Sequence, residues 1–309
     1  MKTAIIMVTY NGWPVTENCL SDLENLPKEN FVVAIADNRS TDNTVENIRE
    51  KFPDVKVYPQ ENNLGFGAAN NAAFKSLIAD NIDFDSVCLL NNDTRFDSKA
   101  IVDLQKSLAE ATEKFGKAIV VPRVKNSDGT PQANYFAKIS NFQFFLNAFR
   151  SQKSAGRHLE GRPIPCKGTS FQTTYWASAV CWIMPRSAFE TLGGFDENIF
   201  MYYEDWDLAH RAISEGFQFY IQDECTITHL GGASAKSSIT RALQHDHSQE
   251  YVFEKHFGIR GKKLSRRFRI CRSLLRFSIA KILNLFNKKY SIYAQEHKAL
   301  LKEALNGNP

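Results

Sequence analysis

The sequence lacks the features of three common classes of protein. Its six cysteines include no CxxC pair, which argues against a disulfide scaffold and against a structural zinc site. Several of them lie in apolar runs, where a thiol behaves as a small buried hydrophobe, as expected in a reducing cytosol. No stretch of about 18 consecutive apolar residues occurs, so we expect no membrane-spanning helix.

Internal repeats and low-complexity segments are also absent, and 43% hydrophobic with 23% charged residues argues against disorder. The 309 residues suit two average domains, or one large α/β domain with an appendage. The first apolar run, residues 4–8, is too short for the core of a signal peptide and predicts a buried strand. We therefore expect a cytoplasmic protein.

Acidic residues are missing from residues 255–289, which contain twelve lysines and arginines. Since the formal net charge is +4 and the last twenty residues are neutral overall, residues 1–254 carry −8. Apolar residues recur every three or four positions among the basic ones, which predicts a basic amphipathic helix over 262–289. Such a helix either docks on an anionic membrane surface, at the inner face of the cell membrane, or packs on a core. Its apolar stripe argues against a nucleic-acid partner.

The first half of the chain alternates strands with helices. Apolar, strand-like runs lie near residues 3–9, 31–37, 55–59, 86–90 and 117–121. Helical patterns lie between them, near residues 14–26, 42–51, 67–80 and 98–113. This alternation predicts an α/β fold with a mostly parallel sheet covered on both faces, in which ligands bind beyond the carboxyl ends of the strands.

The second half is less regular. Periodicity fades over 122–174, which predicts an insertion on the acceptor side of a site. It is followed by an expected strand over 175–184, a short helix from Arg186 and the loop 193–197. A helix from Glu204 and a strand over 217–221, ending before His229, complete this part. We expect one domain over 1–235 and a basic helical extension over 236–309.

Polar clusters follow two of the expected strands. Asp37 closes an apolar strand, so its carboxylate should point into the ligand crevice, and Ser40 or Thr41 would cap a helix starting near Asp42. The triplet 91–93 (Asn-Asn-Asp) follows the strand over 86–90. Its oxygens suit Mg²⁺ or Mn²⁺, while a turn built from Asn and Asp side chains is the alternative.

A third acidic cluster opens the helix that begins at Glu204. Acids in a first turn complement the helix dipole, which alone would explain Glu204, Asp205 and Asp207. The aromatic run 200–203 before them could instead shield a carboxylate from water and raise its pKa toward that of a general base. Arg211 either pairs with Asp207 at i+4 or faces a phosphate.

Six segments occur in a telling order: VTYNG, ADNRSTDNT, ENNLGFGAANN, LLNNDT, GGFDENIFMYYEDWDLAHR and THLGGAS. Together they resemble family 2 glycosyltransferases of the GT-A fold over roughly residues 1–235, in particular bacterial rhamnosyltransferase-like enzymes that extend cell-surface polysaccharides. The resemblance implies a Rossmann-like, mostly parallel sheet flanked by helices. It also implies an inverting transfer from a nucleoside-diphosphate sugar, dTDP-L-rhamnose or alternatively a UDP-sugar, to a lipid-linked or surface glycan.

The resemblance also assigns roles to residues. It makes Asp205 the catalytic base and places a divalent cation, Mg²⁺ or Mn²⁺, at Asp93 with His229. It puts Asp37 at the nucleotide base and ribose. The remaining substrate-binding residues expected here are Thr9, Tyr10, Asn11, Asn63, Gly65, Asn70, Asn92, Glu204 and Arg211.

The sequence departs from the family pattern at three places. Asn91 stands where the first acid of the DxD motif is usual, which lowers the charge of the metal site. Asn70 or Asn71 replaces an arginine that often contacts the diphosphate, and Ser178 replaces a frequent glycine.

Other functions fit the sequence less well. A Rossmann dehydrogenase would need a third glycine where Asn70 stands, and its loop would follow the first strand. A nucleotidyltransferase would need a basic, glycine-rich loop after that strand. A non-catalytic glycan-binding module on the same fold stays open, as does a homo-oligomer.

Overall fold

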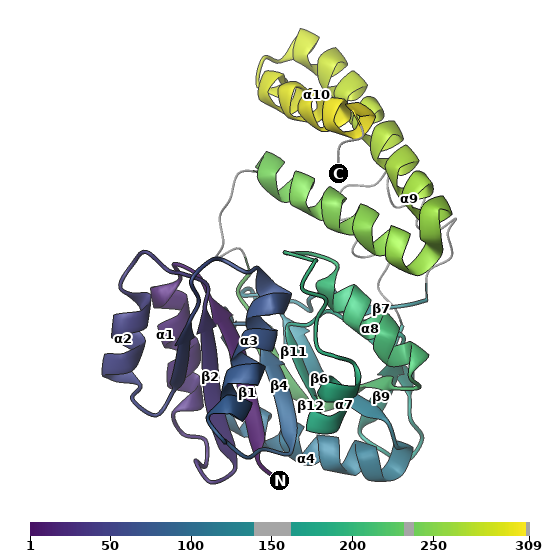
Figure 1. Cartoon of the computed structure of the whole chain (residues 1–309). Helices are drawn as coiled ribbons and strands as arrows, with labels where there is room; N and C mark the ends of the chain where they lie inside the picture. The colour runs from purple at the N-terminus through teal and green to yellow at the C-terminus, as the bar shows by residue number, and fades with distance from the viewer. Residues whose placement is uncertain (139–161, 232–237, 307–309) are drawn as a thin grey trace. The chain divides into compact units, whose positions relative to one another are not determined.

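The computed structural model describes residues 1–138, 162–231 and 238–306. These residues form two compact units, each considered by itself (Figure 1). The first unit holds residues 1–138, 162–200 and 204–231, and the second holds 201–203 and 238–306. Residues 139–161 of the expected insertion lie outside the described residues.

A parallel half-sheet forms the start of the first unit. Its strands are rich in Val, Ile and Ala, which suit strands buried on both faces, and β1 and β4 are almost fully buried. Thr9 lies opposite Asp37 in the register, so the loops after the first two strands begin side by side. The order is β3-β2-β1-β4, with bounds β1 Thr3–Thr9, β2 Phe31–Asp37, β3 Lys56–Pro59 and β4 Ser86–Leu90.

Antiparallel strands extend this sheet beyond β4. β11 (Cys181–Pro185) runs antiparallel between β4 and β6 (Ala118–Lys125), so β6 again points in the direction of β4. β12 (Gln218–His229) is parallel to β6 and therefore ends at the same edge of the sheet. The remaining strands are β5 Thr94–Arg95, β8 Ile164–Pro165, β9 Phe171–Thr174 and the separate pair β7 Tyr135–Phe136 with β10 Trp176–Ala177.

Helices cover both faces of the sheet. On one face α3 (Phe66–Ala79), α7 (Arg186–Thr191) and α8 (Glu204–Ser214) bury a core that includes Phe74, Phe189 and Leu208. On the other face lie α1 (Trp13–Leu23), α2 (Thr44–Lys51) and α4 (Ser98–Phe115). The predicted α/β architecture, with a mostly parallel centre flanked by helices, is confirmed.

Three local predictions were wrong. The expected strand over 175–184 is two strands, because Trp176–Ala177 pairs with β7 and only β11 joins the main sheet. The expected strand over 217–221 continues to His229, since a register irregularity between Gln222 and Thr226 lets it pass the polar residues that interrupt its apolar pattern. Neither Ser40 nor Thr41 caps α2, which begins at Thr44 after Asn43.

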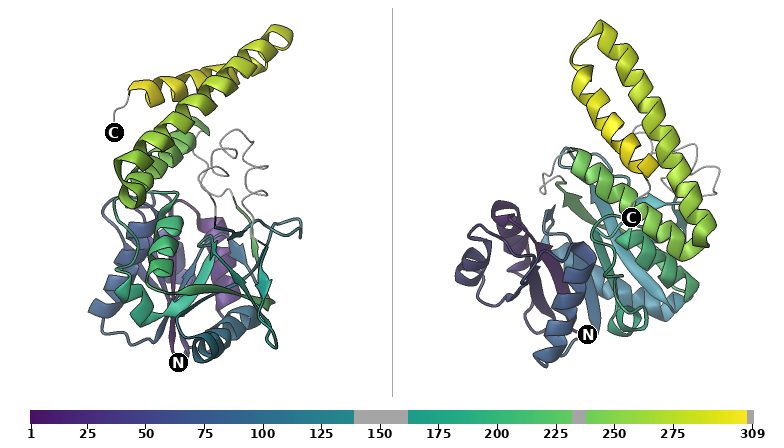
Figure 2. Two further views of the ribbon diagram at one scale, coloured as in Figure 1. Left: turned by 90° about the vertical axis from the view of Figure 1, so that its right-hand side faces the viewer. Right: turned by 45° about the horizontal axis from the view of Figure 1, so that its top comes forward.

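The second unit is helical. α9 (Ser238–Phe286) changes direction at Gly258, whose φ of 65° is non-helical, and α10 (Tyr290–Asn306) packs alongside α9, as both views in Figure 2 show. Arg266 of α9 donates to the last carbonyls of α10, at Ala304 (3.0 Å) and Leu305 (2.9 Å). Among the described residues we find no helix long and apolar enough to cross a membrane.

Candidate active site

The carboxyl ends of β1, β2, β4 and β12 meet at one edge of the sheet. The side chains predicted to carry chemistry lie in the loops that leave this edge, as expected for an open α/β sheet. Asp93 follows β4, and its backbone carbonyl accepts a hydrogen bond from Leu230 (2.9 Å), directly after His229. The fold thus brings together segments that are more than a hundred residues apart.

The loop after β2 is closed by the Asp37 carboxylate. Ser40 donates to it twice, from its backbone N (2.8 Å) and from its Oγ (2.5 Å), and Asp37 is only 1% exposed. Asn11 ties the loop after β1 to this turn, since its N donates to Ser40 Oγ (2.8 Å) and its Oδ1 accepts from Thr41 N (2.7 Å). The carboxylate expected to point into the crevice is turned into its own loop.

Two further predicted binding residues also make structural contacts. Asn92 donates from Nδ2 to Thr16 Oγ1 (2.9 Å) and Thr9 Oγ1 (3.4 Å), and the two threonine hydroxyls lie 3.1 Å apart. Thr9 is 1% exposed, so its side chain is shielded from a ligand by its neighbours. Tyr10, at 40% exposure, presents the open side chain of this loop.

Asn38, which sequence reasoning did not single out, joins this loop to the start of α3. Its Nδ2 donates to the Gly65 carbonyl (2.9 Å) and its Oδ1 accepts from Leu64 N (3.1 Å), while Asn63 Oδ1 accepts from Gly65 N (3.0 Å). Gly65 has a φ of 83°, and a Cβ there would lie 2.0 Å from the carbonyl oxygen of Phe200. Only glycine fits this approach.

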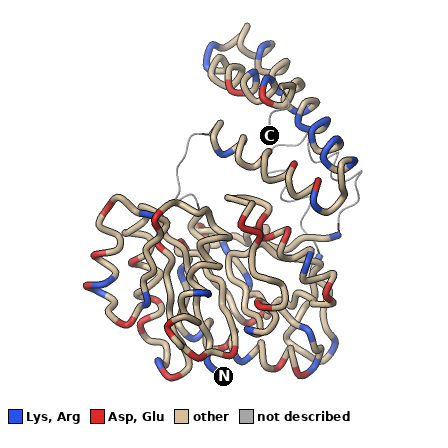
Figure 3. Tube along the Cα trace, in the orientation of Figure 1, with Lys and Arg blue, Asp and Glu red and all other residues tan. Residues whose placement is uncertain are grey.

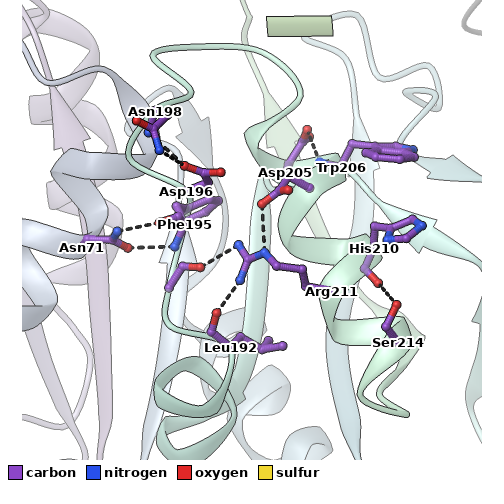
Figure 4. Close-up of polar contacts among 12 residues, drawn as sticks. Asn71, Leu192, Phe195, Asp196, Asn198, Asp205, Trp206, His210, Arg211 and Ser214 are labelled. Carbon is purple, nitrogen blue, oxygen red and sulfur yellow. Dashed lines mark hydrogen bonds and ion pairs between the residues drawn. The ribbon is translucent and has the colours of Figure 1, made fainter. Parts of the chain in front are cut away.

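The side chains of Asn70 and Asn71, at the positions where an arginine often contacts the diphosphate, are both buried. Asn70 is buried and donates back to the Phe66 carbonyl of its own helix (2.9 Å). Asn71 holds the loop before α8, donating to the Phe195 carbonyl (2.8 Å) and accepting from Phe195 N (2.9 Å) (Figure 4).

Arg211 is also committed to internal contacts. Its Nε donates to Asp207 (2.9 Å), and its other nitrogens donate to the carbonyls of Leu192 and Gly194 at the end of α7 (Figure 4). Of our two alternatives, the structure contains the pairing with Asp207. A phosphate contact of Arg211 would require these bonds to break.

Asp93 and His229 lie together at the edge of the sheet. His229 Nε2 is 3.1 Å from Asp93 Oδ1, and Nδ1 is 2.8 Å from Gln132 Oε1. Asn91 Nδ2 lies 3.5 Å from the same imidazole, and Asn91 Oδ1 is buried with no hydrogen-bond partner. In the described part of the chain no cluster holds three or more His, Cys, Asp or Glu side chains suited to a metal.

These donors fit a divalent cation shared with a substrate. A carboxylate, an imidazole and an unpaired amide oxygen offer oxygen and nitrogen ligands to Mn²⁺ or Mg²⁺. A cation held by so few protein groups takes its remaining ligands from water or phosphate oxygens. These three protein groups would therefore hold the cation together with a bound ligand that supplies further oxygen ligands.

A pair of adjacent carboxyl groups opens α8. Asp205 accepts from Trp206 N (2.7 Å; Figure 4) and more weakly from Ala179 N (3.4 Å). Glu204 is 8% exposed, and its Oε2 has no hydrogen-bond partner. Burial, together with the Asp205 charge, raises the pKa of Glu204 to about 8, and burial also raises the pKa of Asp205.

Ser178 lies between the Glu204–Asp205 pair and Asn134, a second buried side chain that has an atom without a hydrogen-bond partner. Its Oγ donates to Asn134 Oδ1, its N donates to the Asn134 carbonyl (3.0 Å), and Ala179 after it contacts Asp205. Asn134 is fully buried, with Nδ2 unpaired. All the unpaired buried side-chain atoms that we find in the described residues of the first unit, on Asn91, Asn134 and Glu204, thus adjoin the candidate site.

Comparisons of the sequence with known proteins identify a family and a relative of similar length. A sequence model of the family described as "Glycosyl transferase family 2" matches residues 4–193. An N-acetylglucosaminyl-diphospho-decaprenol L-rhamnosyltransferase of Mycobacterium tuberculosis is 27% identical over 313 aligned residues, covering 93% of this chain and 98% of the relative.

Solved structures share the fold. A mannosyltransferase of Pyrobaculum calidifontis, in complex with GDP-Man and Mn²⁺, superposes with a TM-score of 0.54 at 15% identity, covering 99% of this chain and 86% of the other. S. aureus TarS superposes with a TM-score of 0.52 at 17% identity, covering 87% of this chain and 42% of TarS.

Replacing Gly65 should weaken the fold at the site. Gly65→Ala combines a left-handed backbone with a clash against the Phe200 carbonyl, so we expect it to lower the free energy of unfolding by about 2–5 kcal/mol. Gly129→Ala is the matched control, because Gly129 has a φ of 80° with nothing within 4 Å of its Cβ position. The free energies of unfolding would be measured with urea. An equal decrease in the two variants would show that Gly65 does not lie against the Phe200 carbonyl.

The raised pKa of Glu204 predicts a pH-dependent stability. Between its ordinary value of 4.5 and about 8, the folded state keeps a proton that the unfolded chain has released. The unfolded state therefore binds fewer protons, and the unfolding free energy falls as pH rises through this window. We expect the wild-type melting temperature to fall from pH 5 to pH 8, and to fall less in Glu204→Gln. Parallel pH profiles of the two proteins would contradict the burial of an unpaired carboxyl group.

Proposed function

Because this chain belongs to glycosyl transferase family 2, we propose that it transfers an L-rhamnosyl unit from a nucleoside-diphosphate sugar, dTDP-L-rhamnose, to a saccharide on a polyprenyl diphosphate. The similarity to an N-acetylglucosaminyl-diphospho-decaprenol L-rhamnosyltransferase over nearly the whole of both chains supports the L-rhamnosyl unit and the acceptor. UDP-sugars are the alternative donors. The observation that carries the proposal is the partly exposed Asp205 carboxylate, next to the buried Glu204, at the carboxyl edge of the sheet.

Asp205 acts as the general base. Its carboxylate accepts the proton of the acceptor hydroxyl while that oxygen forms a bond to the anomeric carbon and the bond to the diphosphate breaks. The high pKa of Glu204 keeps this neighbour protonated near neutral pH, so Asp205 carries the negative charge of the pair. Because a protonated Glu204 is a poor nucleophile, the single base Asp205 favours a single displacement, with inversion of the anomeric configuration.

Asp93, His229 and the Asn91 oxygen would hold a divalent cation, which when bound supplies positive charge to the leaving diphosphate. Around it, the locked loops of Asn11 and Asp37 form one wall for the nucleotide, with the exposed Tyr10 ring at its rim. These groups bind and orient the donor.

The second unit supplies a surface for a lipid-linked acceptor. Leu285 and Phe286, at the end of α9, are 82% and 84% exposed, and exposed lysines Lys281, Lys288 and Lys289 flank them. Figure 3 shows lysines and arginines spread along α9. Apolar side chains ringed by lysines suit insertion into an anionic membrane surface.

Not all of the basic segment is available to lipid. Arg269 pairs with Glu250 (3.0 Å) and Arg272 pairs with Asp246 (2.5 Å) within the second unit. Arg266 contacts the end of α10. Of the two alternatives for this helix, packing thus accounts for part of its residues, and the membrane proposal rests on those near 281–289.

Removing the base should abolish transfer and spare donor binding. We expect Asp205→Asn to lower kcat by about 10²–10⁴-fold with an unchanged donor Kd, because the base acts on the acceptor. Glu215→Gln, at an exposed position directly after α8, is the matched control. Radiolabelled-sugar transfer and calorimetric donor binding provide the two readouts, and near wild-type turnover in Asp205→Asn would remove this residue from the mechanism.

Removing the Asp93 carboxylate should remove the effect of the cation on the donor. We expect Mn²⁺ to tighten donor binding by the wild type and to have little effect on Asp93→Ala, while both bind equally in EDTA. Titrations of the donor with and without Mn²⁺ measure this. A wild-type affinity that does not respond to Mn²⁺ would contradict the metal site.

Membrane attachment should depend on the end of α9. We expect co-sedimentation with vesicles that contain phosphatidylglycerol and release by high salt, since each lysine near an anionic surface contributes about 1 kcal/mol. Leu285→Ser with Phe286→Ser should reduce binding, whereas Leu305→Ser, an exposed leucine of α10, should not. Equal binding to neutral and anionic vesicles would leave this region as a packing or oligomer surface.

A further inference from the structure

The backbone directly before α8 has an uncommon conformation. Tyr202 and Tyr203, which precede Glu204 at the start of α8, both have a φ of 67°. No other two consecutive non-glycine residues in the described part of the chain both have a positive φ. Bulky side chains disfavour this left-handed conformation, so it persists only where surrounding contacts hold it, and such residues cluster at functional sites.

Contacts to this segment come from one face of α9, within the second unit. Ser248 Oγ donates to the Met201 carbonyl (2.7 Å), and Gln249 Nε2 donates to the Tyr203 hydroxyl (2.6 Å). The His245 ring packs edge-on against the Tyr203 ring, with the two centroids 5.0 Å apart. Positions 245, 248 and 249 share one face of a helix, because residues three and four apart are neighbours there.

The two polar side chains of α9 that contact the segment are buried. Ser248 is 4% exposed and Gln249 is 5% exposed, and Ser265 Oγ donates to Gln249 Oε1 (3.3 Å). A buried amide without a partner is costly, so Gln249 favours the arrangement in which the Tyr203 hydroxyl lies against it. The α9 side chains therefore favour one conformation of the segment.

Residues 201–203 form a short connection between two fixed parts of the first unit. Before them, the Phe200 carbonyl accepts from Phe66 N at the start of α3 (3.0 Å). After them, α8 begins at Glu204 and carries Asp205 in its first turn. Since each residue has only two soft backbone angles, the angles of this segment determine the direction in which the first turn of α8 begins.

We propose that Ser248 and Gln249 are positioning residues for the catalytic base. They hold the segment 201–203 in its left-handed conformation and so place the Asp205 carboxylate for proton transfer. The role in catalysis rests on the proposed function, whereas the backbone conformation and its contacts do not. Because a displacement of about 1 Å can lower a rate about 100-fold, loss of either contact should reduce turnover.

Turnover and donor affinity separate this role from a general loss of fold. We expect Ser248→Ala and Gln249→Met each to lower kcat by about 10–100-fold with an unchanged donor Kd, since the proposed donor-binding groups lie in the loops after β1, β2 and β4. Gln218→Met is the matched control. It removes the acceptor of another tyrosine hydroxyl, that of Tyr220 (2.8 Å), at the amino end of β12, and should leave kcat unchanged.

Tyr203→Phe tests the same hydrogen bond from its other side. It leaves Gln249 Nε2 without this partner, just as Gln249→Met leaves the Tyr203 hydroxyl without this donor. Because one bond is removed in both cases, the double variant should lose no more kcat than the slower single variant. Losses that multiply in the double variant would contradict a shared role of the two side chains.

The left-handed conformation is measurable without substrate. Tyr202→Gly and Tyr202→Ala both remove the ring, and only glycine adopts a positive φ without a steric penalty. We expect the Tyr202→Gly protein to melt at the higher temperature, whereas at a residue with negative φ the alanine variant would be the more stable. In hydrogen exchange followed by mass spectrometry, residues 201–206 should exchange faster in Gln249→Met than in the wild type or in Gln218→Met.

Four results would overturn the proposal. The first two are a Tyr202→Ala protein at least as stable as Tyr202→Gly, and unchanged exchange over 201–206 in Gln249→Met. The third is a donor Kd that rises together with the loss of kcat, which would assign the contacts to the fold alone. The fourth is wild-type kcat in both Ser248→Ala and Gln249→Met, which would leave the proposed function standing. A wild-type protein that transfers no sugar would overturn the proposed function and the positioning role together.

Discussion

The hydrogen bonds among buried polar side chains at the carboxyl edge of the sheet are the constraint on which the site depends. A buried amide or carboxylate is costly unless it is paired, and here the partners lie in neighbouring loops. Asn11 joins the loops after β1 and β2, Asn38 joins β2 to the start of α3, and Asn71 joins α3 to the loop before α8. Each loop is held by hydrogen bonds to a neighbouring loop, so the loops at this edge of the sheet are ordered without a ligand.

The exceptions to this pairing mark where chemistry is expected. Within the described residues of the first unit, the unpaired buried atoms belong to Asn91, Asn134 and Glu204. The Asn91 atom lies beside the Asp93–His229 pair, and Glu204 is the neighbour of Asp205 in the chain. Asn134 bonds to Ser178, whose neighbour Ala179 contacts Asp205. Unpaired polar groups cost stability, and proteins retain them where a ligand or a proton transfer makes use of them. The glycosyltransferase assignment and the location of these atoms therefore support each other.

The sequence predicted the scaffold more fully than the site. Apolar periodicity located β1, β2, β4 and their helices within a few residues, because strands buried on both faces leave a continuous signal. Periodicity could not show that the charged groups of Asp37 and Arg211 bond to other groups of the protein. Those contacts depend on loop geometry and, for Arg211, on residues outside its own helix. Gln132 and Asn134 lie where periodicity fades, and no local pattern distinguishes them from ordinary turn residues.

The product of a single reaction tests the central claim most directly. The protein would be incubated with dTDP-L-rhamnose, Mn²⁺ and a short polyprenyl-diphosphate N-acetylglucosamine, with UDP-sugars in parallel, and the product examined by mass spectrometry and by NMR of its anomeric centre. Our account predicts an acceptor that carries one added sugar whose configuration is opposite to that in the donor. Retention of configuration would contradict Asp205 as the base of a single displacement, and absence of transfer from every donor would contradict the proposed function.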